Sequence, residues 1–413
     1  MTELRISVKN LNADGGVFTT PFWFGFHNNS FDLFNSGEAA SGGLEQLAED
    51  GGGAGLTTEL VNADADGQTA TVASNTGPGP IAPGETASTI VNVDGASNAY
   101  VNYAAMILPS NDAFVGNNAA QLLFSPDGKF LGAHTSTITG AQVYDAGTEV
   151  NTELDAAFIN QTGPNTGVDE NGVVALHPGF NGSLGNPDSD SGDQIILGGT
   201  NAFGEFIDPI AADFTQPGHL VAQIHINTVK ETEGTDGRDK IIGGKDDDLV
   251  SAGDGRDFVF GRAGWDVLDG GNGRDFLSGG RGNDELHGGH GRDVLLGGRD
   301  HDYLSGGHGR DILKGGEGSD VLSGDAGNDF LRGGWGEDTF VFTDGDGHDF
   351  IADFKTGVDQ LALDVSGIET FSDVLDAAEN VYRGVELDFG DSGSIFLRNV
   401  DVAWLSEDDF LFA

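Results

Sequence analysis

Two stretches, GGNGRDFLS at 270–278 and GGHGRDILK at 306–314, show the pattern that decides the fold of this 413-residue chain. The nine-residue phrase repeats without a break from residue 234 to residue 341, which makes twelve copies in register. Each copy opens with a glycine-rich turn, because glycine readily adopts positive φ, and continues into a short strand. One copy cannot bury its apolar side chain alone, so the copies must stack into a solenoid.

The sixth and eighth places of the phrase are uniform. The sixth place is an aspartate in every copy: Asp239, Asp248, Asp257, Asp266, Asp275, Asp284, Asp293, Asp302, Asp311, Asp320, Asp329 and Asp338. The eighth place is apolar in every copy: Ile241, Val250, Val259, Leu268, Leu277, Leu286, Leu295, Leu304, Leu313, Leu322, Leu331 and Phe340. We expect the apolar residues to point inward and form one continuous core.

Two copies make one coil, so alternate aspartates stack on the same side, roughly 4.8 Å apart, as neighbouring strands are. The first column is Asp239, Asp257, Asp275, Asp293, Asp311 and Asp329, and the second column is the other six. Stacked carboxylates repel one another unless a cation lies between them. Ca²⁺ suits the gaps, because carboxylates and turn carbonyls supply the oxygen ligands that it takes, and at most about five gaps lie in each column.

This stretch resembles the haemolysin-type (RTX) repeat, GGxGxD followed by x, an apolar residue and x. The resemblance implies a parallel β-roll that binds several calcium ions. A glycine-rich disordered linker is the alternative, but low complexity would not hold two residue types in phase through twelve copies.

A few copies depart from the glycine pattern. The substituted places are Asp246 and Asp300 at the fourth position, Arg262 and Asp325 at the second, and Ala252 at the first. Aspartate tolerates left-handed backbone better than most residues. We therefore expect weaker calcium sites at these places and an unbroken roll.

Acidic residues dominate every part of the chain, whose formal net charge is −48. Residues 1–233 hold 28 acids against 4 Lys and Arg, residues 234–341 hold 22 against 12, and residues 342–413 hold 17 against 3. This balance argues against nucleic acid and anionic membranes as partners, because no basic face meets phosphate. Divalent cations, or surfaces reached through them, fit better.

The chain has no cysteine, so neither disulfides nor zinc–thiolate sites hold it together. The opening MTELRISVKNLN lacks the basic and apolar regions of a signal peptide, and no apolar stretch approaches the length of a membrane span. An intracellular location would follow, but calcium sites of this kind fill outside the cell.

Residues 3–227 alternate short strands with turn residues, which is typical of an antiparallel β-sandwich. In RISVKNL we expect Ile6 and Val8 to point inward. In LVAQIHI we expect the same of Leu220, Ala222, Ile224 and Ile226. A short helix is expected over 44–49.

Four phrases in this region resemble the spondin amino-terminal domain in a bacterial form: TPFWFGFHNNSFDLFNSGEAAS (20–41), LEQLAEDG (44–51), MILPSNDAFVG (106–116) and YDAGTEVNTE (144–153). The resemblance implies a β-sandwich similar to C2 domains, with one calcium held by Asp112, Asp145 and Glu149. Turn capping by Asp112 and Asp145 through their own backbone is the alternative.

The region after the last copy contains alternating stretches at 340–354, 359–365 and 392–400 that can close the open end of the roll. SDVLDAAENV at 372–381 predicts one helix with Ser372 as its N-cap. The region resembles the carboxy-terminal cap of RTX proteins, and the ending EDDFLFA is similar to their uncleaved type I secretion signal.

A secreted hydrolase that uses the roll for secretion and folding is the main alternative function. The chain has neither an HExxH helix nor a GxSxG elbow. His27 could lie in a pocket, but no nucleophile or acid partner is evident. Four histidines of the repeats could hold zinc but more simply face solvent: His287, His290, His301 and His308. A pore-forming toxin would need an apolar membrane segment, and the sequence has none.

The sequence thus predicts an all-β protein with three parts: a C2-like, spondin-type sandwich (1–229), a calcium-binding β-roll (230–341) and a small β-rich cap with a secretion signal (342–413). We expect a secreted, non-enzymatic protein of the matrix, cell surface or surface layer. Calcium would fold it, and its partners would be copies of itself or a surface polymer.

Overall fold

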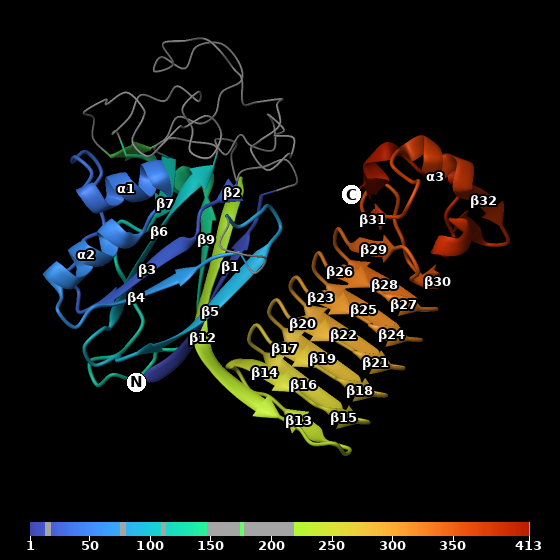
Figure 1. Ribbon diagram of the computed structural model, residues 1–413, viewed down its shortest axis with the longest axis horizontal. Coiled ribbons are helices and arrows are strands. Elements are labelled where there is room, and N and C mark those ends of the chain that lie inside the picture. The colour runs from blue at the N-terminus through green and yellow to red at the C-terminus, as the bar shows by residue number, and fades with distance from the viewer. Residues whose placement is uncertain (13–17, 75–79, 109–112, 147–173, 177–218, 413) are drawn as a thin grey trace, which may run out of the picture. The chain divides into compact units, whose positions relative to one another are not determined.

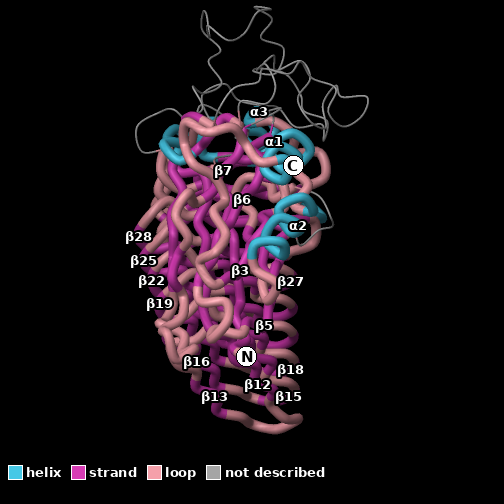
Figure 2. The backbone as a smooth tube through the Cα atoms, turned by 90° about the vertical axis from the view of Figure 1, so that its left-hand side faces the viewer, coloured by secondary structure: helices cyan, strands magenta, loops and turns pink. Residues whose placement is uncertain are grey.

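The structure is a computed structural model that describes residues 1–12, 18–74, 80–108, 113–146, 174–176 and 219–412. Its contacts divide the chain into two units, Met1–Thr228 and Val229–Ala413. Figure 1 labels the elements along the chain, and Figure 2 shows that strands dominate both units. None of the described helices has the length and apolar character needed to span a membrane.

The first unit contains two largely antiparallel sheets. Its strands are β1 (Thr2–Asn10), β2 (Phe18–Thr19), β3 (Phe22–His27), β4 (Gln68–Val72), β5 (Thr86–Val93), β6 (Tyr100–Leu108), β7 (Ala113–Gly116), β8 (Gln121–Leu122), β9 (His134–Thr139), β10 (Val143–Asp145), β11 (Ala175–Leu176) and β12 (Leu220–Glu233). One sheet has β1 between β12 and β5, and the other runs β11-β10-β7-β6-β3-β4. Side chains from both sheets share one apolar core, so the predicted sandwich is confirmed.

The two strands with predicted inward faces pair with each other, since β1 and β12 are antiparallel neighbours. Ile6 and Val8 are buried as expected. Leu220 is exposed, contrary to the prediction, and Val221 is buried in its place. The pairing of β12 with β9 has a register shift between Leu220 and Ala222. This shift explains the error, because a bulge turns the side chain that precedes it to the other face of the sheet.

Two helices, α1 (Gly42–Asp50) and α2 (Ala54–Ala63), contribute to a second apolar cluster in this unit. The predicted helix at 44–49 lies within α1, which starts where the Ser41 side chain accepts a hydrogen bond from the Leu44 amide. The second helix was not predicted. Its signal is short, because only Leu56 and Leu60 are buried along it.

The twelve copies form a regular succession of parallel strands in the second unit. They are β13 (Lys240–Ile242), β14 (Asp247–Ser251), β15 (Asp254–Gly255), β16 (Phe258–Ala263), β17 (Val267–Asp269), β18 (Asn272–Gly273), β19 (Phe276–Arg281), β20 (Glu285–His287), β21 (His290–Gly291), β22 (Val294–Arg299), β23 (Tyr303–Ser305), β24 (His308–Gly309), β25 (Ile312–Glu317), β26 (Val321–Ser323), β27 (Ala326–Gly327) and β28 (Phe330–Trp335). Strand residues that pair within the twelve copies are 18 positions apart, as Leu277 and Leu295 are. The stacked rows are visible in Figure 1, and the predicted β-roll is confirmed.

The inward column is buried from Val250 to Phe340, as the repeat predicts. Ile241 is only partly buried, because its strand β13 lies at the end of its sheet and pairs on one side only. The glycine departures leave the roll unbroken. Arg262, Asp300 and Asp325 have positive φ of 85°, 76° and 55°. These residues therefore adopt the left-handed backbone conformation that the turn requires.

The last part of the chain extends both sheets of the roll, as predicted. Its elements are β29 (Thr339–Thr343), β30 (Gly347–Ile351), β31 (Gln360–Asp364), α3 (Phe371–Ala377), β32 (Ala378–Val381), β33 (Gly384–Asp388), β34 (Gly393–Arg398) and β35 (Phe410–Phe412). Strands β30 and β34 extend one sheet, and β31 and β35 extend the other. Roll and cap share one apolar core.

The helix predicted at 372–381 is wrong in both bounds. Thr370 is the N-cap, because its side chain and that of Asp373 form a capping box. The helix ends at Ala377, and the residues that follow form β32, which pairs with β33 in a hairpin. The cross-strand partner thus overrides the helical propensity of the last four residues.

Candidate metal centre

The repeat aspartates are joined by a chain of hydrogen bonds that runs along each column. In every case Oδ1 accepts from the backbone amide of the aspartate one coil earlier, at 2.7–3.2 Å. The amide of Asp275, for example, donates to Oδ1 of Asp293 at 2.7 Å. These bonds fix the carboxylates in the two predicted columns.

The second carboxylate oxygen is buried and lacks a hydrogen-bond donor in most of these aspartates. Among the described residues this holds for Oδ2 of Asp257, Asp275, Asp284, Asp293, Asp311, Asp329 and Asp338. A buried charged oxygen without a donor is strongly destabilising. A cation at this oxygen removes that cost.

Backbone carbonyls face the same space as these oxygens. A Cβ placed on Gly288 would lie 2.5 Å from the carbonyl oxygen of Gly306 and 3.1 Å from Oδ2 of Asp293. The same arrangement recurs at Gly270 and Gly306. No group of three or more His, Asp or Glu side chains converges among the described residues, so carbonyls would complete the shell. A hard cation that accepts mixed carboxylate and carbonyl oxygens, as Ca²⁺ does, fits this donor set.

Burial raises the pKa of six column carboxyls, and neighbouring carboxylates add to the effect: Asp275, Asp284, Asp293, Asp311, Asp329 and Asp338. The pKa of Asp293 and of Asp311 rises to about 7, mainly because burial disfavours the charged form. The pKa of Asp284 lies well above its usual range for the same reason, with Asp266 and Asp302 as the nearest like charges. The folded roll therefore resists ionisation of the groups that calcium needs ionised.

The columns extend beyond the twelve copies, which the sequence reading missed. The amide of Asp329 donates to Oδ1 of Asp349 at 2.9 Å, and that of Asp338 to Oδ1 of Asp359 at 3.2 Å. DGDGHDFIA at 344–352 and FKTGVDQLA at 354–362 are degenerate copies that keep the fourth-place glycine and the sixth-place aspartate. These copies are displaced by two and three residues from the nine-residue frame, but the glycine and aspartate spacing was a usable signal.

Protein groups contact the first aspartate of each column. Oδ2 of Asp239 accepts from the amide and hydroxyl of Thr235 at 2.7 and 2.8 Å. Oδ2 of Asp248 accepts from the Gly244 amide, and the ammonium of Lys230 lies 3.7 Å from its Oδ1. The first copies are thus less in need of a cation than the inner ones.

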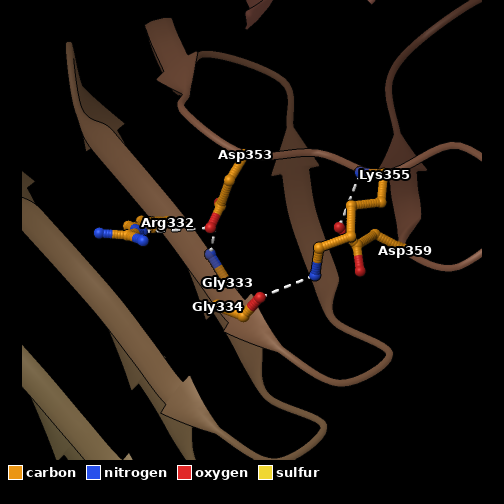
Figure 3. Close-up of polar contacts among 6 residues, drawn as sticks. All are labelled: Arg332, Gly333, Gly334, Asp353, Lys355 and Asp359. Carbon is orange, nitrogen blue, oxygen red and sulfur yellow. Dashed lines mark hydrogen bonds and ion pairs between the residues drawn. The ribbon is translucent and has the colours of Figure 1, made fainter.

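Figure 3 shows the other end of the second column. The Lys355 amide donates to Oδ2 of Asp359 at 2.8 Å, and its Nζ donates to the Gly334 carbonyl at 2.7 Å. Asp353 accepts from Nε of Arg332 at 3.2 Å and from the Gly333 amide at 3.1 Å. The cap supplies its own positive charge and donors to the last turn.

The structure describes one of the three residues of the predicted amino-terminal site. Asp145 is the last residue of β10, where its backbone pairs with Ala113 and Ala175. Asp112 and Glu149 lie outside the described residues. Calcium binding by these three residues stays a prediction.

The histidines have structural partners. Both ring nitrogens of the buried His27 are engaged: Nε2 lies 2.8 Å from Oδ1 of Asn102, and Nδ1 accepts from the Asn29 amide at 3.0 Å. Burial lowers the pKa of His27, which favours the neutral ring. On the roll, His287 pairs with Glu285 at 2.8 Å.

The other repeat histidines contact residues one coil away. His290 and His308 stack with ring centroids 4.6 Å apart, and Nδ1 of His301 accepts from the Ser319 amide at 2.9 Å. These contacts follow from repeating the same place in successive coils.

Comparison with known proteins agrees with both units. A family model for Spondin_N matches residues 21–166. A model for the RTX calcium-binding nonapeptide repeat matches four ranges, 233–268, 242–277, 269–304 and 305–340. A search of curated proteins finds no match.

Among solved structures, a match is the crystal structure of extracellular lipase LipA from Serratia marcescens, at 20% sequence identity and a TM-score of 0.21. The match covers 45% of this chain and 40% of the lipase chain, and it carries no argument about activity. The repeats indicate calcium binding, and together with the amino-terminal domain they indicate an extracellular protein. The chain thus contains a Spondin_N domain followed by RTX calcium-binding nonapeptide repeats folded as a parallel β-solenoid.

Proposed function

We propose that this chain is a non-enzymatic, calcium-dependent structural or attachment protein of the cell exterior. The observation that carries the proposal is the row of buried Oδ2 atoms without donors along the inner coils. These atoms make the fold of the roll conditional on a cation that is abundant outside cells and scarce inside them.

Secretion and folding are coupled in this proposal. The chain leaves the cell unfolded by a type I route and folds when it meets calcium outside.

In this proposal the spondin-type unit makes the contact with a surface or a sister copy, and the roll serves as a calcium-stiffened support. Charge favours calcium-triggered association, because a molecule at −48 repels its copies until cations neutralise the columns. The engagement of both His27 nitrogens within the fold supports a structural role for that histidine, rather than catalysis.

Calcium is expected to convert the dispersed protein into assemblies or into a form retained on the producing cell's surface. A rigid and partly neutralised module loses less entropy on docking than a flexible, highly charged one. Light scattering and cell-retention assays across a calcium titration check this, with magnesium as the control cation and chelator to reverse the effect. A dispersed monomer that binds no cell material in millimolar calcium, yet cleaves a polymer, would replace this proposal with the hydrolase alternative.

We further propose that Asp112, Asp145 and Glu149 hold one calcium in the spondin-type unit. Calorimetry on residues 1–229 is expected to show one site that Asp145→Ala removes while circular dichroism shows an unchanged sandwich. Asp127→Ala is the control, because Asp127 is an exposed carboxylate of the same unit whose neighbour is Ser125. Equal calcium binding in the two variants would refute the site.

A further inference from the structure

We propose that calcium turns one edge of the roll into a docking strip for a linear polyanion. The strip is the arginine column, one guanidinium at the fifth place of each of the first five odd-numbered copies: Arg238, Arg256, Arg274, Arg292 and Arg310. The inference rests on the proposed function and names the chemistry of the partner surface.

The arginine column is straight because its backbone is in register. Arg256, Arg274, Arg292 and Arg310 directly follow the two-residue strands β15, β18, β21 and β24, which pair in parallel from coil to coil. These strands form a visible row in Figure 1. On the same edge, the stacked rings of His290 and His308 measure the step between coils as 4.6 Å. The guanidinium groups are therefore offered at regular, short intervals.

The guanidinium groups are exposed and uncommitted in an otherwise acidic protein. All five arginines are exposed, and none forms an ion pair within 4.0 Å with a carboxylate of the described chain. Two make weaker contacts: Arg238 lies over the Phe258 ring at 4.9 Å, and Nε of Arg310 donates to the Asn328 carbonyl at 3.4 Å. Five of the chain's 19 Lys and Arg residues thus lie in one line, and none of the five is paired with a carboxylate of the described chain.

Calcium decides the sign of this edge. The first column of aspartates runs beside the arginine column, and four of the arginines act on the carboxylate of the next coil, as Arg256 does on Asp275 and Arg274 on Asp293. Without a cation the two rows of charge cancel. With one Ca²⁺ in each gap, the edge carries about +2 per coil, so an anionic partner is attracted only when calcium is bound.

The opposite edge lacks this feature. The fifth place of the even-numbered copies holds Asp247, Trp265, Asn283, His301, Ser319 and Glu337. Equal spacing in a straight row suits a partner whose charges also repeat along a line, such as a sulfated or carboxylated polysaccharide. An acidic globular domain, including the first unit of a sister copy, does not offer a periodic row.

Binding of the full-length protein to immobilised dextran sulfate and to hyaluronate tests the inference and separates a sulfate source from a carboxylate source. Neutral dextran is the control polymer. We expect binding in millimolar calcium, loss in chelator, and weakening by salt. Arg274→Gln with Arg292→Gln should reduce affinity about tenfold, while the charge-matched pair Arg281→Gln with Arg299→Gln, in the neighbouring copies, should change it less than about twofold.

Two further readings keep the result interpretable. Calcium uptake should be retained in both glutamine pairs, and Arg274→Lys with Arg292→Lys should keep affinity within about threefold, because the charge remains. Equal losses in the two glutamine pairs, binding in chelator, or binding to neutral dextran would overturn the inference. If Arg274→Gln with Arg292→Gln abolished self-association but left polyanion binding intact, the inference would also be overturned, since the strip would then dock a sister copy. Retention on cells with no polyanion binding would reject the strip but leave the proposed function standing.

Discussion

Removal of calcium is expected to unfold the roll and cap, residues 234–413, while the amino-terminal unit stays folded. The inner coils bury carboxylate oxygens that have no donor, so chelation leaves two columns of uncompensated charge. The opposing core is thin, with one fully inward apolar side chain per copy, such as Leu295 or Leu313. The free energy of repulsion between the carboxylates therefore exceeds the stabilisation that burial of the apolar column provides.

Hydrogen exchange of the full-length protein in calcium and in chelator measures this directly. Amides of β16, β19 and β22 should exchange within seconds to minutes in chelator, whereas those of β1, β3 and β6 stay protected by their own apolar core. Recovery of protection on adding calcium is the control for irreversible damage. Protection of the roll that is equal in both conditions would contradict the expectation.

Acidification is expected to act in opposite directions on the calcium-free and calcium-bound roll. The folded pKa is about 6 for Asp275, about 7 for Asp293 and about 8 for Asp349, against about 4 in an unfolded chain. Because these folded values are raised, the folded state binds protons more tightly. Its stability without calcium is greatest below the unfolded pKa and is lost as the pH rises through about 6 to 8.

Calcium binding has the reverse dependence, because its ligands must be ionised. Apparent affinity should fall as the pH drops from 8 to 6, while in chelator the β signal in circular dichroism should grow over the same range and on to pH 5. Titrations in calcium and in chelator at each pH make the comparison. A calcium affinity that is flat with pH, or a chelated roll that loses structure on acidification, would show that the buried carboxyls do not control folding.

The roll was predictable because its two decisive places recur with a fixed period. The inward column from Val250 to Phe340 and the twelve aspartates lie where the pattern puts them. The pattern fails where its frame shifts. Asp349 and Asp359 continue the columns but follow insertions, so a strict nine-residue frame misses them, and the hydrogen bonds from Asp329 and Asp338 place them in the columns.

The less periodic parts were predictable in kind and not in detail. Alternation placed Ile6 and Val8 inward, but the bulge that turns Leu220 outward depends on pairing with β9, a strand distant in sequence. The cap helix was misplaced because a hairpin partner draws Ala378–Val381 into a strand. The fifth-place arginines carried no meaning in a linear reading, since a single arginine is unremarkable until the coils stack it into a row.

Native mass spectrometry of the full-length protein across a calcium titration tests directly whether inter-coil calcium ions fold the roll. We expect several ions to bind together, with few intermediate species, and the charge-state distribution to shift from unfolded to compact in the same step. Asp293→Asn should weaken this step, and Asp269→Asn, an exposed carboxylate of the roll outside the two columns, should not. A compact protein without bound calcium, or independent binding of ions that leaves compactness unchanged, would contradict this expectation.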